Sequence, residues 1–386
     1  MNVLHVIPYF NPKRGGDVNV CCMVAKELAN KGNNVTIITT DYEFDKEYAS
    51  SIKKVNIIPF RCFVNLSLFL ISPSMINWLK KNLADFDVIH LHDFRTFQNI
   101  LIWHYAKKYN IPYIIQAHGD LPYAGIKNRR KRAFDEMFGY PILNNASGLI
   151  ALTATELEEY INMGAKKENI VIIPNGVDLS GFEILPKKGE FRKKFSISQN
   201  YKIILYIGRI HKTKGLDLLL HAFRYLLNEQ DNKSQIILLV VGPDYGELES
   251  LKKLAKDLDI ADNVVFTGFV SQREKTEAFV DADIFVTPTF LGFPVSFLEA
   301  CICGKPIITT TNGDNLDWIN NSVGYVVDFD EHHLAAGMLN ILNDRNLTKR
   351  FGEEGKRLAK EKFNWVKIVN NIEDFYKRCN IKYSCR

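Results

Sequence analysis

The stretch YKIILYIGRIHKTKGLDLLLHAF, residues 201–223, joins a strand, a loop and a helix in that order. Its start, YKIILYIG, is a run of apolar and β-branched residues of strand length. Arg209, Lys212 and Lys214 crowd the following loop, and Gly215 leads into LDLLLHAF, which predicts a helix. A strand that passes through a loop into a helix is the building unit of a parallel sheet covered by helices.

Apolar runs of strand length recur along the whole chain. They lie at 3–7, 35–40, 55–60, 88–92, 113–118, 149–153 and 170–174 in the first half, and at 201–208, 236–242, 264–268, 284–289, 306–310 and 324–327 in the second. Continuous apolar strands that alternate with helices predict an α/β protein with parallel sheets buried on both faces. We therefore expect two doubly wound domains of similar size that face each other across a cleft.

The expected domain boundaries follow the breaks in this pattern. Residues 1–180 form the first domain and residues 201–364 the second. Between them, residues 181–200 lack a sustained strand and carry glycine, proline and clustered charges, which favours a linker with a short helix. Residues 365–386 are amphipathic and predict a C-terminal packing helix.

The composition is that of an ordinary globular chain of 386 residues, with 46% hydrophobic and 24% charged residues. A net charge of +5 is too small to indicate nucleic acid. The seven cysteines are scattered without paired CxxC units, so zinc is not indicated and a reducing cytoplasm fits. The N-terminus is typical of a strand and not of a signal peptide, and no apolar run reaches the ~18 residues that span a bilayer.

Residues that follow the strands are the first candidates for a site, because parallel sheets bind ligands beyond the carboxyl ends of their strands. After the strand at 201–208, the fork-shaped Arg209 and the point charge of Lys214 suit a diphosphate. A solvated basic loop is the alternative. Gly15 and Gly16, after the first strand, would offer backbone N–H groups to an anion, although plain turn glycines are an equal alternative.

Neither nucleotide fingerprints nor metal-binding motifs stand out. No two of the 23 glycines are separated by a single residue, so GxGxxG cannot occur, and GxxxxGK[ST] is also missing. His118 ends a strand and could polarise a sugar hydroxyl, brace a phosphate or be structural. His90 and His92 share a strand face, but no third ligand is identifiable, so a structural role is favoured. DxD occurs four times, which makes any one occurrence uninformative, and we predict no essential metal.

A lone acidic residue, Glu299, lies in the apolar stretch VSFLEACIC. Pro294 suits the first turn of a helix and Gly304 its end, so residues 294–303 predict a short buried helix. A buried carboxylate needs hydrogen-bond donors, because its desolvation costs roughly several kcal/mol. Two interpretations remain open, an internal Arg or Lys partner and the hydroxyl groups of a ligand.

The basic run KNRRKR, residues 127–132, precedes the helical pattern AFDEMFGYPIL. Arg129, Arg130, Lys131 and Arg132 could contact anionic lipid headgroups or the phosphates of an acceptor, at about 1 kcal/mol per cation near a charged surface. A solvated helix face is an equal alternative.

Six motifs occur in order along nearly the whole chain: HGD (118–120), IIPNGVD (172–178), GRIHKTKG (208–215), VVGPDYGELESL (240–251), VVFTGFV (264–270) and FLEACICGKPIITT (297–310). Together they resemble the large retaining glycosyltransferases of family 4, the glycosyl transferases group 1 type. The resemblance implies the GT-B fold, with an acceptor-binding N-terminal domain and a C-terminal domain that binds a nucleotide sugar. It also implies metal independence and a C-terminal helix that crosses back to the first domain.

The resemblance assigns roles to single residues. His118, Arg209 and Lys214 match catalytic positions: the histidine lies near the transferred sugar, and the two cations hold the donor diphosphate. Glu299 matches the second glutamate of the family's Glu–seven residues–Glu motif, which binds the ribose diol. The other donor-binding positions that it implies are Gly15, Gly16, Gly208, Phe269, Val295 and Ser296.

Two positions depart from the family pattern. Leu291 replaces the first glutamate of the motif and can accept no hydrogen bond from sugar hydroxyls. Pro294 stands where the family often has a glycine, and proline has no N–H group for phosphate. Nucleotide binding is therefore expected to be intact and sugar recognition altered. Two outcomes are open: the donor is a sugar that lacks a hydroxyl at this place, such as a deoxy or substituted one, or Asp314 or Asn315 supplies the contact.

The sequence thus predicts a retaining glycosyltransferase that moves a sugar from a nucleotide sugar, with UDP favoured over GDP, to a glycan or lipid-linked acceptor. The expected process is cell-surface polysaccharide or glycolipid synthesis, with no cofactor and no nucleic-acid partner. We expect a cytoplasmic protein that can associate with the inner face of the cell membrane. The alternatives are a catalytically weak nucleotide-binding subunit, because of Leu291, and a sugar-nucleotide epimerase of similar two-domain fold.

Overall fold

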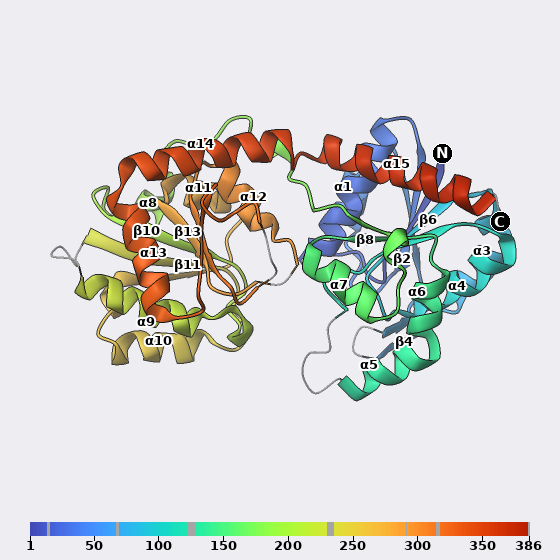
Figure 1. Ribbon diagram of the computed structural model, residues 1–386, viewed down its shortest axis with the longest axis horizontal. Helices are drawn as coiled ribbons and strands as arrows, with labels where there is room; N and C mark the ends of the chain where they lie inside the picture. Colours follow the sequence, from blue (N-terminus) through green and yellow to red (C-terminus); the bar gives the residue numbers. More distant parts are fainter. Residues whose placement is uncertain are drawn as a thin grey trace. The chain divides into compact units, whose positions relative to one another are not determined.

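The computed structural model describes residues 1–13, 16–66, 69–121, 128–229, 235–290, 292–313 and 317–384. The chain divides into two compact units (Figure 1). Met1–Gly176 and Trp365–Arg386 form the first unit, and Val177–Asn364 forms the second. The last helix therefore belongs to the first unit, and the stretch expected as a linker, 181–200, lies within the second.

The described strands of the first unit form a parallel sheet in the order β3-β2-β1-β6-β7-β8-β9. Its strands are β1 (Asn2–Val6), β2 (Asn34–Thr40), β3 (Val55–Phe60), β6 (Val88–His92), β7 (Tyr113–Gln116), β8 (Gly148–Ala151) and β9 (Ile170–Ile172). A separate antiparallel hairpin pairs β4 (Val64–Leu66) with β5 (Phe69–Ile71). The strand order reverses at β1, which pairs with β2 on one side and β6 on the other, so the loops after β1 and β6 meet at a switch point.

Helices cover both faces of this sheet. They are α1 (Gly16–Asn30), α2 (Lys46–Ser51), α3 (Ser74–Asn82), α4 (Phe97–Tyr109), α5 (Asn128–Phe134), α6 (Tyr140–Asn145), α7 (Ala154–Asn162) and α15 (Trp365–Ser384), with 3-10 turns at Leu83–Asp85 and Lys167–Asn169. A π-helical turn, Asp135–Gly139, joins α5 to α6. One hydrophobic core lies between the sheet and α3, α4 and α6, and the other lies between the sheet and α1 and α15.

Helix α15 packs along α1 in the first unit (Figure 1). Ile368, Ile372 and Tyr376 recur at helical spacing on its buried face, which explains the amphipathic pattern of this segment. Lys31, which follows α1, forms an ion pair with Glu373 on the exposed side. Burial of one apolar face is therefore what holds the C-terminal helix on this unit.

The second unit repeats the topology of the first, with the described strands in the order β12-β11-β10-β13-β14-β15, all parallel. The strands are β10 (Lys202–Ile207), β11 (Ile236–Val241), β12 (Val264–Gly268), β13 (Ile284–Thr287), β14 (Ile307–Thr310) and β15 (Gly324–Val327). The helices are α8 (Glu190–Lys194), α9 (Leu216–Asn228), α10 (Leu248–Asp257), α11 (Gln272–Asp281), α12 (Val295–Ile302), α13 (Glu331–Asn343) and α14 (Arg345–Glu361), with 3-10 turns at Leu179–Phe182, Lys212–Lys214 and Ala261–Asn263. The prediction of an α/β protein with two doubly wound parallel sheets is confirmed.

Helix α8 ties the stretch that precedes β10 to the rest of the second unit. Arg192 is buried, and its backbone N–H donates to the Asp281 carboxylate at 3.0 Å. Its guanidinium donates to the carbonyls of Ser198 at 2.9 Å and Tyr201 at 2.8 Å. The backbone bond and a guanidinium bond to the Asp281 carbonyl at 3.0 Å anchor residues 189–201 to α11.

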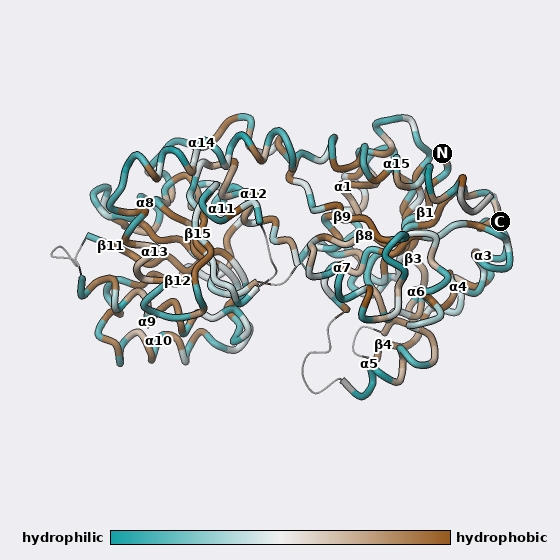
Figure 2. Tube along the Cα trace, viewed as in Figure 1, coloured by the Kyte–Doolittle hydropathy of each residue, from teal (hydrophilic) through white to brown (hydrophobic). Residues whose placement is uncertain are grey.

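The hydropathy of the chain follows this layering. The strands of both sheets are mostly brown in Figure 2, and the helices alternate between brown and teal as their faces turn from core to solvent. No helix in the described ranges is long and apolar enough to cross a membrane.

Candidate active site

The loop after β10 begins at Gly208 and carries both predicted diphosphate ligands. The Gly208 N–H donates to the Val241 carbonyl at 3.0 Å, and the Tyr206 hydroxyl donates to the Arg209 carbonyl at 3.0 Å. Gly242 has φ 144°, and a Cβ atom there would lie 1.9 Å from the Gly208 carbonyl oxygen. The loops after β10 and β11 therefore approach each other backbone to backbone, which requires glycine at position 242.

Lys214 ends the 3-10 turn that follows, and Gly215 comes next with a left-handed φ of 66°. A Cβ atom on Gly215 would lie 3.0 Å from the Thr289 hydroxyl oxygen, so this turn lies against the segment after β13. Lys214 is half-buried. Its backbone N–H donates to the His211 carbonyl at 2.9 Å, but no hydrogen bond or ion pair joins its side chain to another described residue. Its burial, and then the charge of Arg209, lower the pKa of Lys214.

Arg209 is exposed in the same loop, with its guanidinium carbon 5.4 Å from the centre of the Tyr245 ring. A cation–π contact of this kind orients the guanidinium without neutralising it. Among the described residues, neither Arg209 nor Lys214 has a carboxylate partner. Two cations that repel each other in one strand-end loop make a site for an anion, and their fork and point-charge geometries suit a diphosphate.

Helix α12 begins after Pro294, in the segment that follows β13, and no side chain caps its N-terminus. The N–H groups of Val295 and Ser296 precede the first hydrogen bonds within the helix, so they are open to an external acceptor. They also lie at the positive end of the helix dipole, where anions are stabilised. The two predicted backbone donors are thus present on the second unit.

Glu299, on the same helix, is buried and has an internal partner. Lys275 Nζ lies 2.6 Å from its Oε1, and Gln272 Nε2 donates to the same oxygen at 3.4 Å. Both partners come from α11, so the first of the two interpretations, an internal cation, holds for Oε1. No described residue bonds Oε2, and contact between that oxygen and a ribose stays a prediction.

The other predicted donor-binding residues fall into two groups. Phe269 follows β12 with 73% of its surface exposed, so packing within its own unit does not explain it. The remaining predicted positions, Gly15, Leu291, Asp314 and Asn315, lie outside the described residues.

In the first unit, Gly16 opens α1 at the switch point of the sheet. No described atom lies within 4 Å of a Cβ atom placed on Gly16, so the backbone is accessible there. The next residue, Asp17, accepts a hydrogen bond from the Tyr9 hydroxyl at 2.6 Å. Asp93 follows β6 with φ 67°, and its burial, followed by the charges of Asp17 and Asp120, raises the pKa of its carboxyl.

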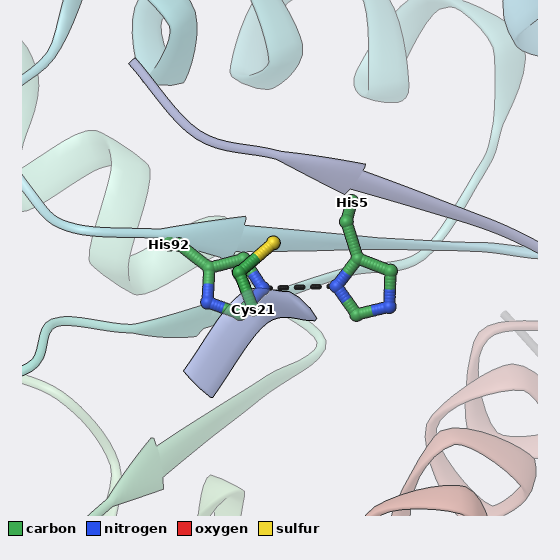
Figure 3. Close-up of side chains that lie close together, drawn as sticks. All are labelled: His5, Cys21 and His92. Carbon is green, nitrogen blue, oxygen red and sulfur yellow. Dashed lines mark hydrogen bonds between the residues drawn. The ribbon is translucent and has the colours of Figure 1, made fainter. Parts of the chain in front are cut away.

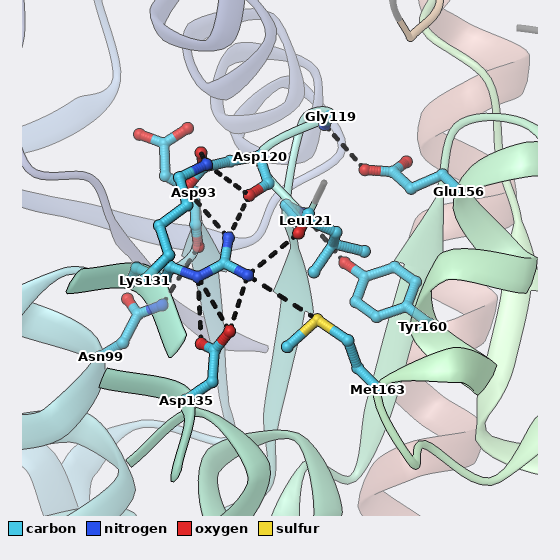
Figure 4. Close-up of polar contacts among 12 residues, drawn as sticks. Asp93, Asn99, Gly119, Asp120, Leu121, Lys131, Asp135, Glu156, Tyr160 and Met163 are labelled. Atoms are coloured by element: carbon cyan, nitrogen blue, oxygen red, sulfur yellow. Dashed lines mark hydrogen bonds and ion pairs between the residues drawn. The ribbon is translucent and has the colours of Figure 1, made fainter. Parts of the chain in front are cut away.

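His118 follows β7 in a left-handed conformation, φ 54°, which is uncommon for a residue with a side chain. Its neighbours are fixed by α7: the Ala117 N–H donates to the Tyr160 hydroxyl at 3.0 Å, and the Gly119 N–H donates to Glu156 Oε1 at 2.8 Å (Figure 4). The second oxygen of Glu156 accepts the Leu152 N–H at 2.6 Å. The strained loop is thus held in place from both sides.

Arg95, which none of the sequence motifs includes, also binds the loop that follows His118. Its guanidinium binds Asp135 with contacts of 3.0 and 2.8 Å and donates to the carbonyls of Asp120 and Leu121 (Figure 4). Lys131, predicted to meet an acceptor or membrane, lies 3.0 Å from the Asp120 carboxylate. Arg95 comes shortly after a strand end, which is the sequence signal that could have found it.

Histidines connect His118 to the interior of the first unit. His92 Nδ1 lies 3.0 Å from His118 Nε2, and His92 Nε2 lies 2.9 Å from His5 Nδ1. Burial lowers the pKa of His5 to about 3 and that of His118 to about 4, and it lowers the pKa of His92 well below its ordinary value. Cys21 lies beside them, and the ligand atoms of His5, Cys21 and His92 lie within 4.8 Å of one another (Figure 3). Of the two histidines considered from the sequence, only His92 belongs to this group, and sequence spacing did not reveal its other members, His5 and Cys21.

The basic helix α5 packs against the β4–β5 hairpin through an edge contact of the Phe134 and Phe69 rings, whose centres are 6.1 Å apart. Arg129, Arg130 and Arg132 on α5 are exposed. The hairpin side carries exposed apolar residues: Phe63 (59%), Val64 (42%) and Leu66 (59%). Cations and apolar side chains thus occupy one region of the first unit.

The two doubly wound parallel sheets have the GT-B fold, and the protein is a nucleotide-sugar-dependent glycosyltransferase. Sequence profiles agree over most of the chain. The profile of Glycosyltransferase Family 4 matches residues 14–180, and that of glycosyl transferases group 1 matches residues 187–358. The chain belongs to glycosyltransferase family 4, whose members are retaining enzymes.

Three known proteins illustrate the similarity. An uncharacterized glycosyltransferase of Methanocaldococcus jannaschii is 31% identical over 65% of this chain, which spans 64% of that relative's length. Alpha-monoglucosyldiacylglycerol synthase of Streptococcus pneumoniae is 26% identical over 89% of this chain and 80% of its own. The crystal structure of Anabaena HepE in complex with UDP and glucose shares the fold, with a TM-score of 0.78 and 17% identity over 98% of this chain and all of that one.

Proposed function

We propose that this glycosyltransferase moves a sugar from a nucleoside-diphosphate sugar, UDP favoured over GDP, to a glycan or lipid-linked acceptor at a membrane surface. The process would be cell-surface polysaccharide or glycolipid synthesis. The observation that carries the donor half of the proposal is the Arg209–Lys214 pair, because two cations without a described carboxylate partner need a bound anion. A diphosphate supplies two adjacent negative groups for such a pair of cations.

The pair would act mainly on the leaving group. Negative charge grows on the nucleoside diphosphate as the bond to the anomeric carbon breaks. Fixed cations at that place stabilise the transition state more than the ground state. The open N–H groups of Val295 and Ser296 would add to the same effect.

His118 would face the transferred sugar. The backbone N–H groups of Ala117 and Gly119 on either side of it are bound by Tyr160 and Glu156, so the ring is presented by a rigid loop. A neutral imidazole can donate or accept one hydrogen bond at an oxygen of the sugar. Glu299 would accept a ribose hydroxyl at Oε2 while Lys275 holds Oε1.

The acceptor half of the proposal rests on the surface formed by α5 and the β4–β5 hairpin. Exposed arginines attract anionic headgroups, and exposed apolar side chains such as Phe63 and Leu66 can enter the interface between headgroups and acyl chains. The synthase of Streptococcus pneumoniae named above makes, by its name, a monoglucosyldiacylglycerol. A peripheral position at the inner face of the cell membrane would follow from such docking.

The first experiment tests the donor site. Thermal unfolding is measured with UDP, GDP, ADP and their sugars, and one nucleotide series should stabilise the chain by about 2.7 kcal/mol at roughly 100 times its dissociation constant. Lys214→Ala should then lower turnover by about 10²-fold, since one donor to a developing charge contributes that much. Lys212→Ala, in the same turn but exposed, is the matched control and should change turnover little.

The outcomes separate the alternatives. If nucleotides bind but no product forms from any donor with a broad acceptor panel, the chain is a nucleotide-binding subunit and the proposed transfer is wrong. If the sugar of the donor changes configuration without transfer, the enzyme is an epimerase. Equal losses in Lys214→Ala and Lys212→Ala would remove Lys214 from the site.

The second experiment tests the membrane surface. Arg129→Gln with Arg130→Gln should reduce sedimentation with anionic vesicles, whereas Lys80→Gln with Lys81→Gln removes the same charge from exposed positions on α3 and should not. Lys131 is left intact because it contacts Asp120. Wild-type protein that does not sediment at low salt would contradict membrane docking.

A further inference from the structure

A row of three imidazole rings leads from the interior of the first unit to His118. His5 comes from β1, His92 ends the neighbouring strand β6, and His118 follows β7. Two ring-to-ring hydrogen bonds join them, from His5 Nδ1 to His92 Nε2 at 2.9 Å and from His92 Nδ1 to His118 Nε2 at 3.0 Å. We call these residues the histidine row.

The rings of the row are neutral at physiological pH. His5 and His92 have no exposed surface, and burial lowers the pKa of His5 to about 3 and that of His118 to about 4. A neutral imidazole has one N–H donor and one bare nitrogen that accepts. Each hydrogen bond in the row therefore needs a donor on one ring and an acceptor on the next, and both bonds must run in the same direction.

The buried end of the row decides that direction. His5 Nε2 is buried and has no hydrogen-bond partner in the described part of the chain. If the bonds ran inward, His5 would carry its proton on Nε2, and a buried N–H would be left without an acceptor, which is rare and costly in proteins. If they run outward, Nε2 carries only a lone pair, and His5 Nδ1–H donates to His92.

The outward direction of the two hydrogen bonds determines which nitrogen of His118, at the exposed end of the row, carries the proton. His92 then donates from Nδ1–H to His118 Nε2, so His118 must carry its own proton on Nδ1. That nitrogen has no hydrogen-bond partner among the described residues, and His118 is only half-buried, so Nδ1 is the part of the ring available to a ligand.

We propose that His92, itself oriented by His5, is a positioning residue that locks His118 in the Nδ1–H form, so that His118 is a hydrogen-bond donor to an oxygen of the bound substrate. A histidine without such a partner could equally accept a hydrogen bond from a substrate hydroxyl. The row removes that option, because Nε2 is already occupied by the His92 donor. The sequence could not show this, since it depends on the pairing of His5 with the β6 strand.

The same atoms do not suit a metal in this arrangement. His5 Nδ1 and His92 Nε2, which belong to the candidate ligand group with Cys21, point at each other across a hydrogen bond (Figure 3). Burial also raises the pKa of the Cys21 thiol, so the thiolate that a metal needs is disfavoured.

The experiment is long-range ¹H–¹⁵N NMR of the full chain labelled with ¹⁵N-histidine, without ligand. The two nitrogens of each neutral ring have distinct shifts that identify the tautomer, and the His118 signals are assigned by their loss in His118→Gln. We expect the Nδ1–H form for His118. A dominant Nε2–H form, or stoichiometric zinc bound to the purified protein through His92, would overturn the proposal.

Variants test the role of His92. His92→Phe keeps the stacked ring volume but removes the partner of His118, so His118 should lose its single tautomer and show a mixture. His90→Phe is the matched control, because His90 is equally buried on the same strand but bonds Tyr376 and not the row. It should leave His118 in the Nδ1–H form, and a mixture in both variants would mean that packing alone sets the tautomer.

A kinetic comparison links the tautomer to the proposed function. With the UDP-, GDP- or ADP-sugar that the wild type uses, His92→Phe should lower kcat about tenfold, which is the worth of one neutral hydrogen bond, and leave stabilisation by the nucleoside diphosphate unchanged. His90→Phe should lower kcat less than about threefold. This arm rests on the proposed function, whereas the NMR result on the ligand-free chain stands or fails without it.

Discussion

The strand-end loops of the two units differ in how their polar groups are satisfied. In the first unit, Arg95 binds Asp135 and two carbonyls, and the neutral histidines bond one another. In the second unit, Arg209 and Lys214 have no carboxylate partner among the described residues. The six strands of the second sheet follow the same order as the first six of the first sheet, so topology does not cause the difference.

The difference shows what each loop contributes. Polar groups that satisfy one another rigidify a structure and set the direction of a side chain, as around His118. Cations left without partners cost stability and are retained where a ligand completes them. We therefore expect charge removal to destabilise the first unit and to stabilise the second.

Acid should have the largest effect, and it should act on the first unit. The pKa values of His5, His92 and His118 in the folded chain lie below the ordinary histidine value. Between the folded pKa and the ordinary pKa, the unfolded chain therefore binds more protons than the folded chain. Stability from these groups is present above pH 6.5 and lost as pH falls toward about 4, at about 1.4 kcal/mol per pH unit for each histidine.

Hydrogen exchange resolved by peptide checks this from pH 7 to pH 5. Peptides of β1 and β6 should lose protection faster than those of β10 and β11. His104→Gln, at an exposed position, should not change the profile. Equal loss of protection in both units would contradict the assignment of the acid effect to the histidine row.

Loss of the Arg95–Asp135 pair should have the next largest effect. Asp135→Ala removes one partner of a buried ion pair and leaves the guanidinium without its carboxylate, which costs about 3–5 kcal/mol. Urea unfolding of the first unit measures this loss. Lys349→Ala breaks the exposed pair with Glu353 and serves as the control, which should unfold as the wild type does.

Glu299→Gln should have an intermediate effect, on binding and not on folding. The amide keeps the shape of the side chain but loses the charge that strengthens hydrogen bonds to ribose, so nucleoside diphosphate should bind about tenfold more weakly. Calorimetry measures the affinity. Lys275→Met, which removes the internal partner, separates the two roles: if it alone weakens binding and Glu299→Gln does not, Glu299 has no contact with the nucleotide.

The smallest effect should have the opposite sign. Lys214→Met relieves the repulsion with Arg209 and the desolvation of a half-buried ammonium, so the ligand-free second unit should become more stable by about 0.5–1 kcal/mol. Stabilisation by added nucleoside diphosphate should fall in the same variant. A loss of stability without ligand would mean that Lys214 has a structural partner.

The sequence predicted the features that depend on short stretches of chain. Strand runs, the basic loop at Arg209–Lys214 and the buried helix around Glu299 are all local patterns, and the structure contains each of them. The Glu299 partner, Lys275, lies on another helix, and nothing in the local pattern distinguishes it from other lysines. The sequence therefore left both interpretations of Glu299 open.

The histidine row and the Arg95 network depend on strand order and register, which no short pattern determines. His5 meets β6 only because β1 pairs with β6 in parallel, with His5 opposite His90. Asp135 reaches Arg95 from the π-helical turn, which lies beyond α4, β7 and α5 along the chain. Contacts between residues so distant in the sequence could not be predicted from one sequence, even where its strands were located correctly.

The π-helical turn at Asp135–Gly139 has a consequence for helical phase. It inserts one residue per turn between α5 and α6, and an extra residue rotates everything that follows by about 100° about the helix axis. The extra residue thus changes which side of the helix faces the core. The arginines of α5 stay exposed to solvent, whereas Ile142 and Leu143 of α6 are buried in the core. The turn also requires glycine at its end, because a Cβ atom on Gly139 would lie 2.5 Å from Asp135 Oδ1, the oxygen that Arg95 binds. A single-residue deletion here would change the angular alignment of the basic surface with the loop of His118 without altering either segment's own sequence.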